Sequence, residues 1–145
     1  MPERELENKG VSTILQEVAL LLELKGENPS KLKAYGHPTG RLLLAREPYA
    51  IDMIRLIDEA SRSGVVIELN AHPFRLDIDW RLCKYAKEKG VKIAINPDAH
   101  EEDGLKDTFL GVGIARKGWL EPGDILNTMD LEEMRDFLKR RKLSI

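Results

Sequence analysis

Three stretches of the chain have the length and pattern of amphipathic helices. They are residues 11–24, 49–63 and 130–140. In the first, apolar residues recur every three or four positions, and in the second they lie on or near one face, as a helix with 3.6 residues per turn requires. Gly64 follows the second stretch and Asp130 opens the third, so each has a residue suited to that end of a helix.

Two short runs rich in β-branched residues indicate strands. They are residues 65–71 and 91–95. Between them lies a helix that Asp77 or Asp79 can cap and that runs to about Lys89. Strand, helix and strand joined by short turns form a βαβ unit. We therefore expect an α/β fold with a parallel sheet and flanking helices, whose functional residues lie at the carboxyl ends of the strands.

Two further segments have weaker patterns. Residues 30–35 are expected to start a second short helix, although the stretch is too short for its period to decide. Residues 110–114, with the glycines around them, are expected to form a loop or a short edge strand.

Acidic and histidine side chains follow the predicted strands. Asp98 and His100 lie two positions apart after the second strand, and an extended chain would point both the same way. A carboxylate and an imidazole at this spacing suit zinc, manganese or iron, but a capping aspartate and a surface histidine give the same pattern. Two further histidines are candidate ligands: His37, between a glycine and a proline, and His72, after the first strand. The sequence fits a structural role for His37 and an exposed loop position for His72 as well.

Glu68 alternates with Val66 and Asn70 on one face of its strand. A carboxylate inside a parallel sheet is costly unless it is paired, so we expect an ion pair with Arg41 or Arg75 rather than a general base. Both arginines are also candidates for binding substrate, because guanidinium groups match the geometry of phosphates. A purely structural role for either arginine fits the sequence equally well.

Composition places the chain among ordinary globular proteins. Of its 145 residues, 42% are apolar and 33% are charged, and the net charge of -2 gives no global attraction to DNA or to an acidic membrane. Local basic clusters leave nucleic acid open as a partner. The single cysteine, Cys83, is expected to be a small buried side chain and fits a reducing cytoplasm. No apolar run approaches the roughly 20 residues that span a bilayer, and the N-terminus does not read as a signal peptide.

Three separated motifs carry a resemblance to a known family. They are GHPTGRLLLAREPYAIDM from Gly36, VVIELNAHPFRLDIDWRLCKYAKEKGVKIAINPDAH from Val65, and GVGIARKGWLEPGDILNTM from Gly111. In this order and spacing they resemble the C-terminal part of the PHP (polymerase and histidinol phosphatase) domain fused to bacterial and archaeal family X DNA polymerases. The resemblance covers residues 36–145.

The resemblance implies a metal-dependent phosphoesterase. Domains of this family are distorted βα barrels in which mostly histidine ligands hold several divalent metals, and the attached polymerases are credited with 3′–5′ exonuclease and DNA end-processing activity. Of the family's ligands this sequence keeps His37, Asp98 and His100. It therefore implies an incomplete site for zinc or manganese, on a partial barrel-like sheet.

The N-terminal segment resembles another part of the same polymerases. STILQEVALLLELKGENPSKLKAY, from Ser12, is similar to the opening of their N-terminal helical domain. We therefore expect two units, a helical segment at residues 1–35 and the PHP-type part at residues 36–145.

Three hypotheses for function follow. The first is a cytoplasmic phosphoesterase of the 3′–5′ exonuclease kind, inactive or much weakened as an isolated chain. The second is a fragment that folds and self-associates through its open sheet edges but does no chemistry. The third is a nucleic-acid-binding adaptor that uses Lys25, Lys31 and Lys33.

Overall fold

The computed structural model describes residues 34–48 and 50–139 of the chain. Its elements are β1 (Ala34–Tyr35), α3 (Met53–Ser63), β2 (Val66–Asn70), α4 (Trp80–Glu88), β3 (Ile93–Asn96), η2 (Glu102–Asp107), α5 (Thr108–Lys117), η3 (Pro122–Asp124), η4 (Leu126–Thr128) and α6 (Leu131–Lys139). The predicted helix at residues 11–24, and all but the end of the predicted segment 1–35, lie outside the described residues.

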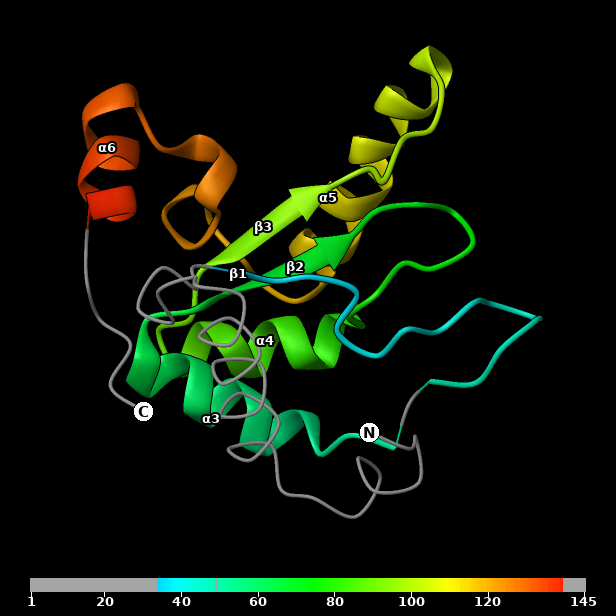
Figure 1. Cartoon of the computed structure of the whole chain (residues 1–145), viewed down its shortest axis with the longest axis horizontal. Helices are drawn as coiled ribbons and strands as arrows, with labels where there is room; N and C mark the ends of the chain where they lie inside the picture. Colours follow the sequence, from blue (N-terminus) through cyan, green and yellow to red (C-terminus); the bar gives the residue numbers. More distant parts are fainter. Residues whose placement is uncertain (1–33, 49, 140–145) are drawn as a thin grey trace, which may run out of the picture.

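The three strands form one parallel sheet in the order β1-β2-β3 (Figure 1). The register places Ala34 beside Val66 and Asn70 beside Asn96. β2 is therefore the central strand, and all three carboxyl ends lie at one edge of the sheet. The predicted α/β class, with a partial barrel-like parallel sheet and flanking helices, is confirmed.

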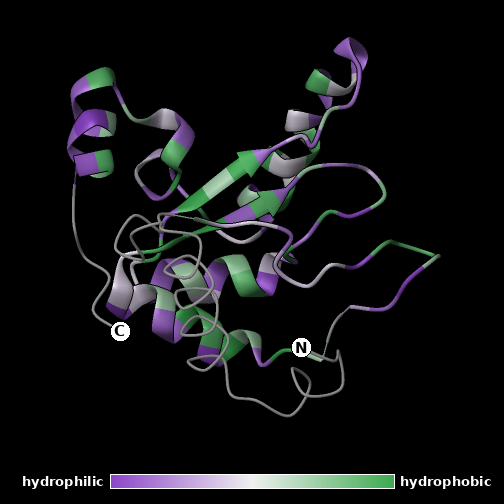
Figure 2. Cartoon of the chain, in the orientation of Figure 1, coloured by the Kyte–Doolittle hydropathy of each residue, from purple (hydrophilic) through white to green (hydrophobic). Residues whose placement is uncertain are grey.

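The main apolar core lies on one face of this sheet, and a smaller cluster of Val66, Ala94 and Phe137 lies on the other. Ile67 and Leu69 of β2 and Ile93 and Ile95 of β3 are at most 5% exposed, and they belong to the same core cluster as buried residues of α3, α4 and α5. α3 and α4 run side by side beneath the sheet in Figure 1. Figure 2 shows that the strands are largely hydrophobic and that α3 and α4 are hydrophilic on their outer sides.

The helices begin and end at the kinds of residue that the sequence predicts. The carboxylate of Asp79 accepts from the backbone amide of Arg81 at 2.8 Å, so Asp79 caps α4. Gly64 ends α3 with a φ of 70°, a left-handed conformation that glycine adopts at little cost. Asp130 and Glu133 exchange side-chain to backbone hydrogen bonds of 2.8 and 2.9 Å, the reciprocal pattern of a capping box, at the start of α6. In the described part of the chain, no helix is both long and apolar enough to cross a membrane.

The expectation of a helix through residues 30–35 is wrong at its end, because Ala34 and Tyr35 form a strand. They pair in parallel with Val66 and Ile67, and Tyr35 packs against the main core cluster. Pairing with β2 satisfies their backbone groups, and two residues are too few for this pairing to leave a period in the sequence. The segment before His37 therefore is the strand that positions this histidine.

The expectation of a loop or edge strand at residues 110–114 is also wrong, because these residues lie inside α5. Gly111 is buried against the sheet, where an added Cβ would come within 2.6 Å of Ile95 and 2.9 Å of Ala71. Gly113 has open space at the same position. The glycines that suggest a loop therefore include one that lets a helix lie close to the sheet.

One edge of the sheet is partly covered. The side-chain amide of Asn127 accepts from the Ile95 backbone N–H at 2.8 Å and donates to the Ile95 carbonyl at 2.9 Å, and Ile125 forms an isolated parallel bridge with Ile93. An asparagine side chain thereby takes the place of a neighbouring strand beside β3. This edge of the sheet is therefore less open than the sequence suggests. Self-association through the remaining sheet edges stays a prediction.

Candidate functional site

Polar side chains gather at the carboxyl edge of the sheet. Glu68 and Asn70 come from β2, Asn96 ends β3, and His37 and Asp98 follow β1 and β3 within two residues. Glu68, Asn70 and Asn96 occupy the face of the sheet opposite to the main core. Because the strands are parallel, all of these groups meet at one place.

Three acceptors converge on a single atom of this group. The side-chain nitrogen Nδ2 of Asn70 lies 3.4 Å from His37 Nδ1, 3.3 Å from Glu68 Oε1 and 3.2 Å from Asp98 Oδ2. The other end of the amide is fixed, because Asn70 Oδ1 accepts from the His72 backbone N–H at 3.0 Å. An amide nitrogen carries two hydrogens, so it cannot fully satisfy three acceptors at once.

Glu68 has different partners from those predicted. We expected an ion pair with Arg41 or Arg75, but among the described residues no arginine pairs with Glu68. Its oxygens accept from the backbone N–H of His37 at 3.1 Å and from Asn96 Nδ2 at 2.8 Å, as well as from Asn70. Amide donors on the same face of the sheet stabilise the carboxylate, and they leave it able to accept a cation.

Hydrogen bonds assign the proton of His37. The Asn70 amide nitrogen can only donate, so His37 Nδ1 is the acceptor and holds the lone pair. A neutral His37 then carries its proton on Nε2. The nitrogen able to bind a metal is therefore the one that faces the Asn70 amide, which also contacts Glu68 and Asp98.

His100 and His72 have opposite arrangements. His100 Nδ1 lies 2.8 Å from the carbonyl oxygen of Asp98, which can only accept, so Nδ1 donates and Nε2 keeps a lone pair. A backbone carbonyl bonded to one imidazole nitrogen is a common companion of metal binding through the other. His72 Nδ1 accepts from the backbone N–H of Phe74 at 3.1 Å, so a neutral His72 has a proton donor at Nε2 rather than a free ligand atom.

The premise that placed Asp98 and His100 on the same side of an extended strand is wrong. β3 ends at Asn96, and Asp98 has a φ of 52°, so the chain turns before it reaches His100. His37 also has a positive φ, of 45°. Non-glycine residues seldom adopt this conformation, although Asp and His do so more often than most. The structure thus brings His37 and Asp98 to Asn70, and it leaves His100 exposed beside them.

Arg41 and Arg75 lie next to this group, in different settings. Arg41 donates from Nε to the Arg75 carbonyl at 2.8 Å and from Nη2 to the Leu76 carbonyl, so it holds the loop after β2 in place. Arg75 donates from Nη1 to the Arg41 carbonyl at 3.3 Å, and its Nε lies 3.6 Å from Asp98 Oδ2. Arg75 is therefore the arginine whose charge faces the converging acceptors.

Asp77 is a residue of this region that sequence reasoning considered only as a helix cap. It is fully buried, and its Oδ2 accepts from the backbone amides of Thr39 at 3.1 Å and Gly40 at 3.2 Å. These bonds fix the turn that follows His37. Asn70 was not singled out either, and the available signal was its place on the same face of the strand as Glu68.

The described residues contain no group of three or more His, Cys, Asp or Glu side chains arranged to hold a metal ion. Asn70 occupies the point on which His37, Glu68 and Asp98 converge. The chemistry of these three groups nevertheless suits a divalent cation, because imidazole nitrogen and carboxylate oxygens are the ligands of zinc and manganese. Asn70 has hydrogens for only two of these acceptors at a time, and Glu68 Oε1 also accepts from the His37 backbone N–H, whereas a cation would interact with all three.

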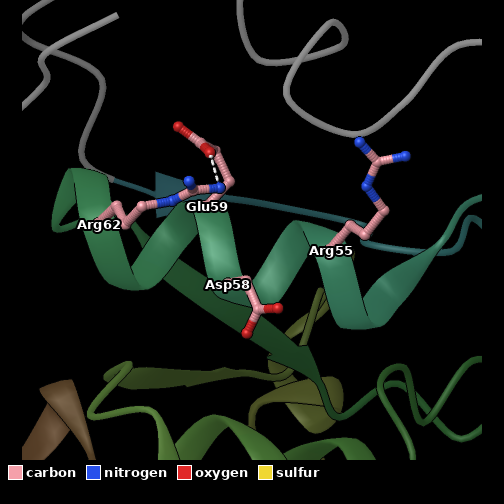
Figure 3. Close-up of a pocket in the computed structure, with 4 residues that line it drawn as sticks. All are labelled: Arg55, Asp58, Glu59 and Arg62. Carbon is pink, nitrogen blue, oxygen red and sulfur yellow. Dashed lines mark ion pairs between the residues drawn. The ribbon is translucent and has the colours of Figure 1, made fainter.

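Other chemically notable groups lie elsewhere. Cys83 is buried, and burial raises the pKa of its thiol to about 12, so the prediction of a small structural side chain is confirmed. A shallow hollow of about 130 Å³ on the outer side of α3 is lined by Arg55, Asp58, Glu59 and Arg62 (Figure 3). All four residues belong to one surface helix, and Glu59 and Arg62 form an ion pair of 2.5 Å. This is the pattern of a solvated helix face rather than of a binding site.

Asp58 points from this helix toward α4 instead (Figure 3). Its Oδ1 accepts from the Tyr85 hydroxyl at 2.8 Å and pairs with Lys89 Nζ at 3.2 Å. The hydrogen bond from Tyr85 holds the pKa of Asp58 below its ordinary value, and the same bond raises the pKa of Tyr85. These groups tie two helices together far from the sheet edge.

Comparison with known proteins identifies relatives of two kinds. The DNA polymerase/3′-5′ exonuclease PolX of Bacillus subtilis is 45% identical over 104 residues, which are 72% of this chain and 18% of that protein. Two probable phosphatases, from a Thermoanaerobacter species and from Thermoanaerobacter pseudethanolicus, are each 28% identical over 116 residues, 76% of this chain and 44% of theirs. The chain therefore spans less than half the length of each relative. No protein-family model matches it.

These relatives confirm the resemblance predicted from the sequence, which is to the PHP domain of family X DNA polymerases.

Proposed function

We propose that the chain is a metal-dependent phosphoesterase of the 3′–5′ exonuclease kind, which acts on DNA ends at the carboxyl edge of the sheet. The observation that carries this proposal is the convergence of His37 Nδ1, Glu68 Oε1 and Asp98 Oδ2 on one point, each within 3.2–3.4 Å of Asn70 Nδ2. The names of the relatives, a 3′-5′ exonuclease and two probable phosphatases, support the reaction class.

In this proposal His37, Glu68 and Asp98 hold one divalent ion, zinc or manganese, after the Asn70 amide turns aside. His100 offers Nε2 as a further ligand, because its Nδ1 is engaged by the Asp98 carbonyl. A divalent ion in such a site supplies Lewis acidity toward a phosphoryl oxygen and makes water acidic enough to ionise near neutral pH.

The other residues bind and orient the phosphate. Arg75 holds Asp98 only loosely, at 3.6 Å, so its guanidinium can turn to a phosphate oxygen. Arg41 positions Arg75 through the carbonyl bonds described above. Neutral His72 presents an N–H at Nε2, which suits donation to a phosphate oxygen or to a leaving hydroxyl group. We expect such a site to work weakly in the isolated chain, because only four candidate ligands are available where several metals are expected.

A second candidate function is DNA binding without catalysis, for which the sequence offers Lys25, Lys31 and Lys33. The described residues contain no group of side chains already arranged to hold a metal ion, and the Asn70 amide nitrogen occupies the position between the three acceptors. In this alternative the polar group stabilises the sheet edge and does no chemistry. For either function we expect the chain to act in the cytoplasm. We also expect it to self-associate, and sedimentation at micromolar concentration can measure this association.

Calorimetric titration with manganese tests the proposed site. We expect one ion per chain, and Asp98→Asn should weaken its binding at least tenfold because the substitution removes one charged ligand. Asp103→Asn is the matched control: its side chain is 88% exposed and contacts Lys106. Digestion of a 5′-labelled DNA strand in the presence of manganese then measures release of 3′ nucleotides.

The outcomes separate the two functions. Binding with turnover, both lost in Asp98→Asn, supports the phosphoesterase. Stoichiometric binding without turnover supports a vestigial site. No manganese binding at millimolar concentration, or equal binding by wild type and Asp98→Asn, excludes this placement of the metal.

A further inference from the structure

We propose that Phe74 is a stacking platform for the terminal base of a single-stranded 3′ end, an inference that rests on the proposed function and adds the part of the substrate that this site recognises. Phe74 lies in the loop between β2 and α4, and 65% of its surface is exposed. It contributes little to the core. Its setting nevertheless differs from that of an ordinary surface residue.

The loop that carries Phe74 is held firmly. The Phe74 backbone N–H donates to His72 Nδ1 at 3.1 Å, and the Phe74 carbonyl accepts from the Leu43 N–H at 2.6 Å. The N–H groups of Arg75 and Leu76 both donate to the His72 carbonyl, at 2.8 and 3.0 Å. The backbone on both sides of the ring is therefore fixed, while the ring itself remains open to a ligand. Ordering it again on binding would cost little entropy.

This ring stands beside the candidate site. Its centroid is 5.1 Å from that of the His72 imidazole, with the planes tilted by 57°. The His72 backbone N–H in turn donates to Asn70 Oδ1, and Asn70 Nδ2 is the atom on which the three acceptors converge. His72 therefore links Phe74 to Asn70, which lies where the proposed function places phosphate cleavage. Arg75, the next residue in the chain, faces Asp98 at that point.

Apolar side chains extend the exposed surface around the ring. Leu43 is 39% exposed and Leu44 is fully exposed, at the tip of the turn whose backbone is bonded to Phe74. This turn is the protruding loop that follows β1 in Figure 1, and its tip is hydrophobic in Figure 2. An aromatic ring with an apolar margin, beside an arginine, fits a flat base attached to a phosphate. The π-face is common to all four bases, so we expect recognition of an unpaired base without preference for its identity.

Anisotropy of a 5′-fluorescein-labelled single strand tests this inference, with EDTA present so that neither cleavage nor metal binding contributes. Two probes are compared, identical except that one ends in a 3′ adenine nucleotide and the other in a 3′ abasic residue. We expect the full chain to bind the first about five- to a hundredfold more tightly, the range given by stacking of one base. Phe74→Ala should abolish this difference, and Phe74→Trp should keep it.

Trp119→Ala provides the matched control. Trp119 is 73% exposed, and its carbonyl accepts from Lys87 in the last turn of α4, away from the loop that carries Phe74. This variant should discriminate between the probes as the wild type does. Phe74→Leu, which keeps an apolar side chain without the aromatic face, should lose most of the difference.

Equal discrimination by wild type and Phe74→Ala would overturn the inference, and so would equal binding of both probes by the wild type. Neither result depends on the manganese titration. A chain that binds manganese but does not distinguish the probes contradicts the platform alone. A chain that distinguishes the probes through Phe74 but binds no manganese contradicts the phosphoesterase and leaves the platform as part of a DNA-binding surface.

Discussion

The two faces of the sheet are built in different ways. On one face, Ile67 and Leu69 of β2 pack against helices and are fully buried. On the other, Val66 packs in a smaller apolar cluster, whereas Glu68 and Asn70 lie in a network of hydrogen bonds at the carboxyl end of the strand. Successive side chains of a strand point to opposite faces, so neighbouring residues of the five-residue strand β2 have different surroundings.

The difference between the faces separates stability from function. Apolar packing contributes roughly in proportion to the area buried. The face that packs against α3, α4 and α5 should therefore provide most of the folding free energy. The polar face gains little net energy from each hydrogen bond, because unfolding exchanges these bonds for bonds to water. At the carboxyl end of this face, replacements are therefore expected to change binding at a smaller cost in stability than in the main core.

The largest effect is expected on the apolar face. Ile67→Ala should lower the free energy of unfolding by about 2–5 kcal/mol, because it removes buried methylene groups from the central strand and leaves a cavity. Urea unfolding followed by circular dichroism measures this loss. Where the variant still folds, manganese affinity should stay within about twofold of wild type, and a larger change would show that the two faces are coupled.

Two glycines of α5 provide a sharper test of packing on that face. Gly111→Ala should destabilise the chain by about 1–3 kcal/mol, because its Cβ would approach Ile95 to 2.6 Å and Ala71 to 2.9 Å. Gly113→Ala should instead stabilise it by about 0.5–1 kcal/mol, because nothing lies within 4 Å of the added carbon and alanine favours a helix. Thermal melting of both variants checks the signs. Stabilisation of similar size in both variants would mean that helix propensity, not contact with the sheet, decides at both positions.

A smaller effect on stability is expected on the polar face. Asn96→Ala removes the 2.8 Å hydrogen bond to Glu68 and should cost about 1.5 kcal/mol, the low end for a bond to a charged group. The same urea titration serves here. A loss as large as that of Ile67→Ala would contradict the proposed division between the faces.

The smallest effect is expected away from both faces, at the surface pair that joins α3 to α4. The pKa of Asp58 is held below its ordinary value of 3.8, so its contribution to stability is fully present above that pH and is lost as the pH falls through the folded-state pKa. Asp58→Asn should therefore be slightly less stable than wild type at pH 7, and this difference should shrink at pH 3. Asp103→Asn should show no such convergence.

The sequence alone was sufficient for the order and type of most elements. Apolar spacing located α3, capping residues located α4 and α6, and β-branched runs located β2 and β3. It also predicted that candidate site residues follow parallel strands, and the three quoted motifs indicated the resemblance to the polymerase family. These features depend on neighbours in the chain, which sequence patterns record directly.

Only the tertiary structure decided the rest. Ala34–Tyr35 is a strand because β2 lies beside it, and Gly111 lies in a helix because Ile95 and Ala71 leave room for no side chain there. Asn70 became the centre of the site because β1, β2 and β3 bring His37, Glu68 and Asp98 to its amide. The spacing of Asp98 and His100 suggested a shared site through an extended strand, whereas the chain turns at Asp98, before it reaches His100. Each of these outcomes depends on contacts between residues distant in sequence, and no local pattern of hydrophobic and polar positions specifies such contacts.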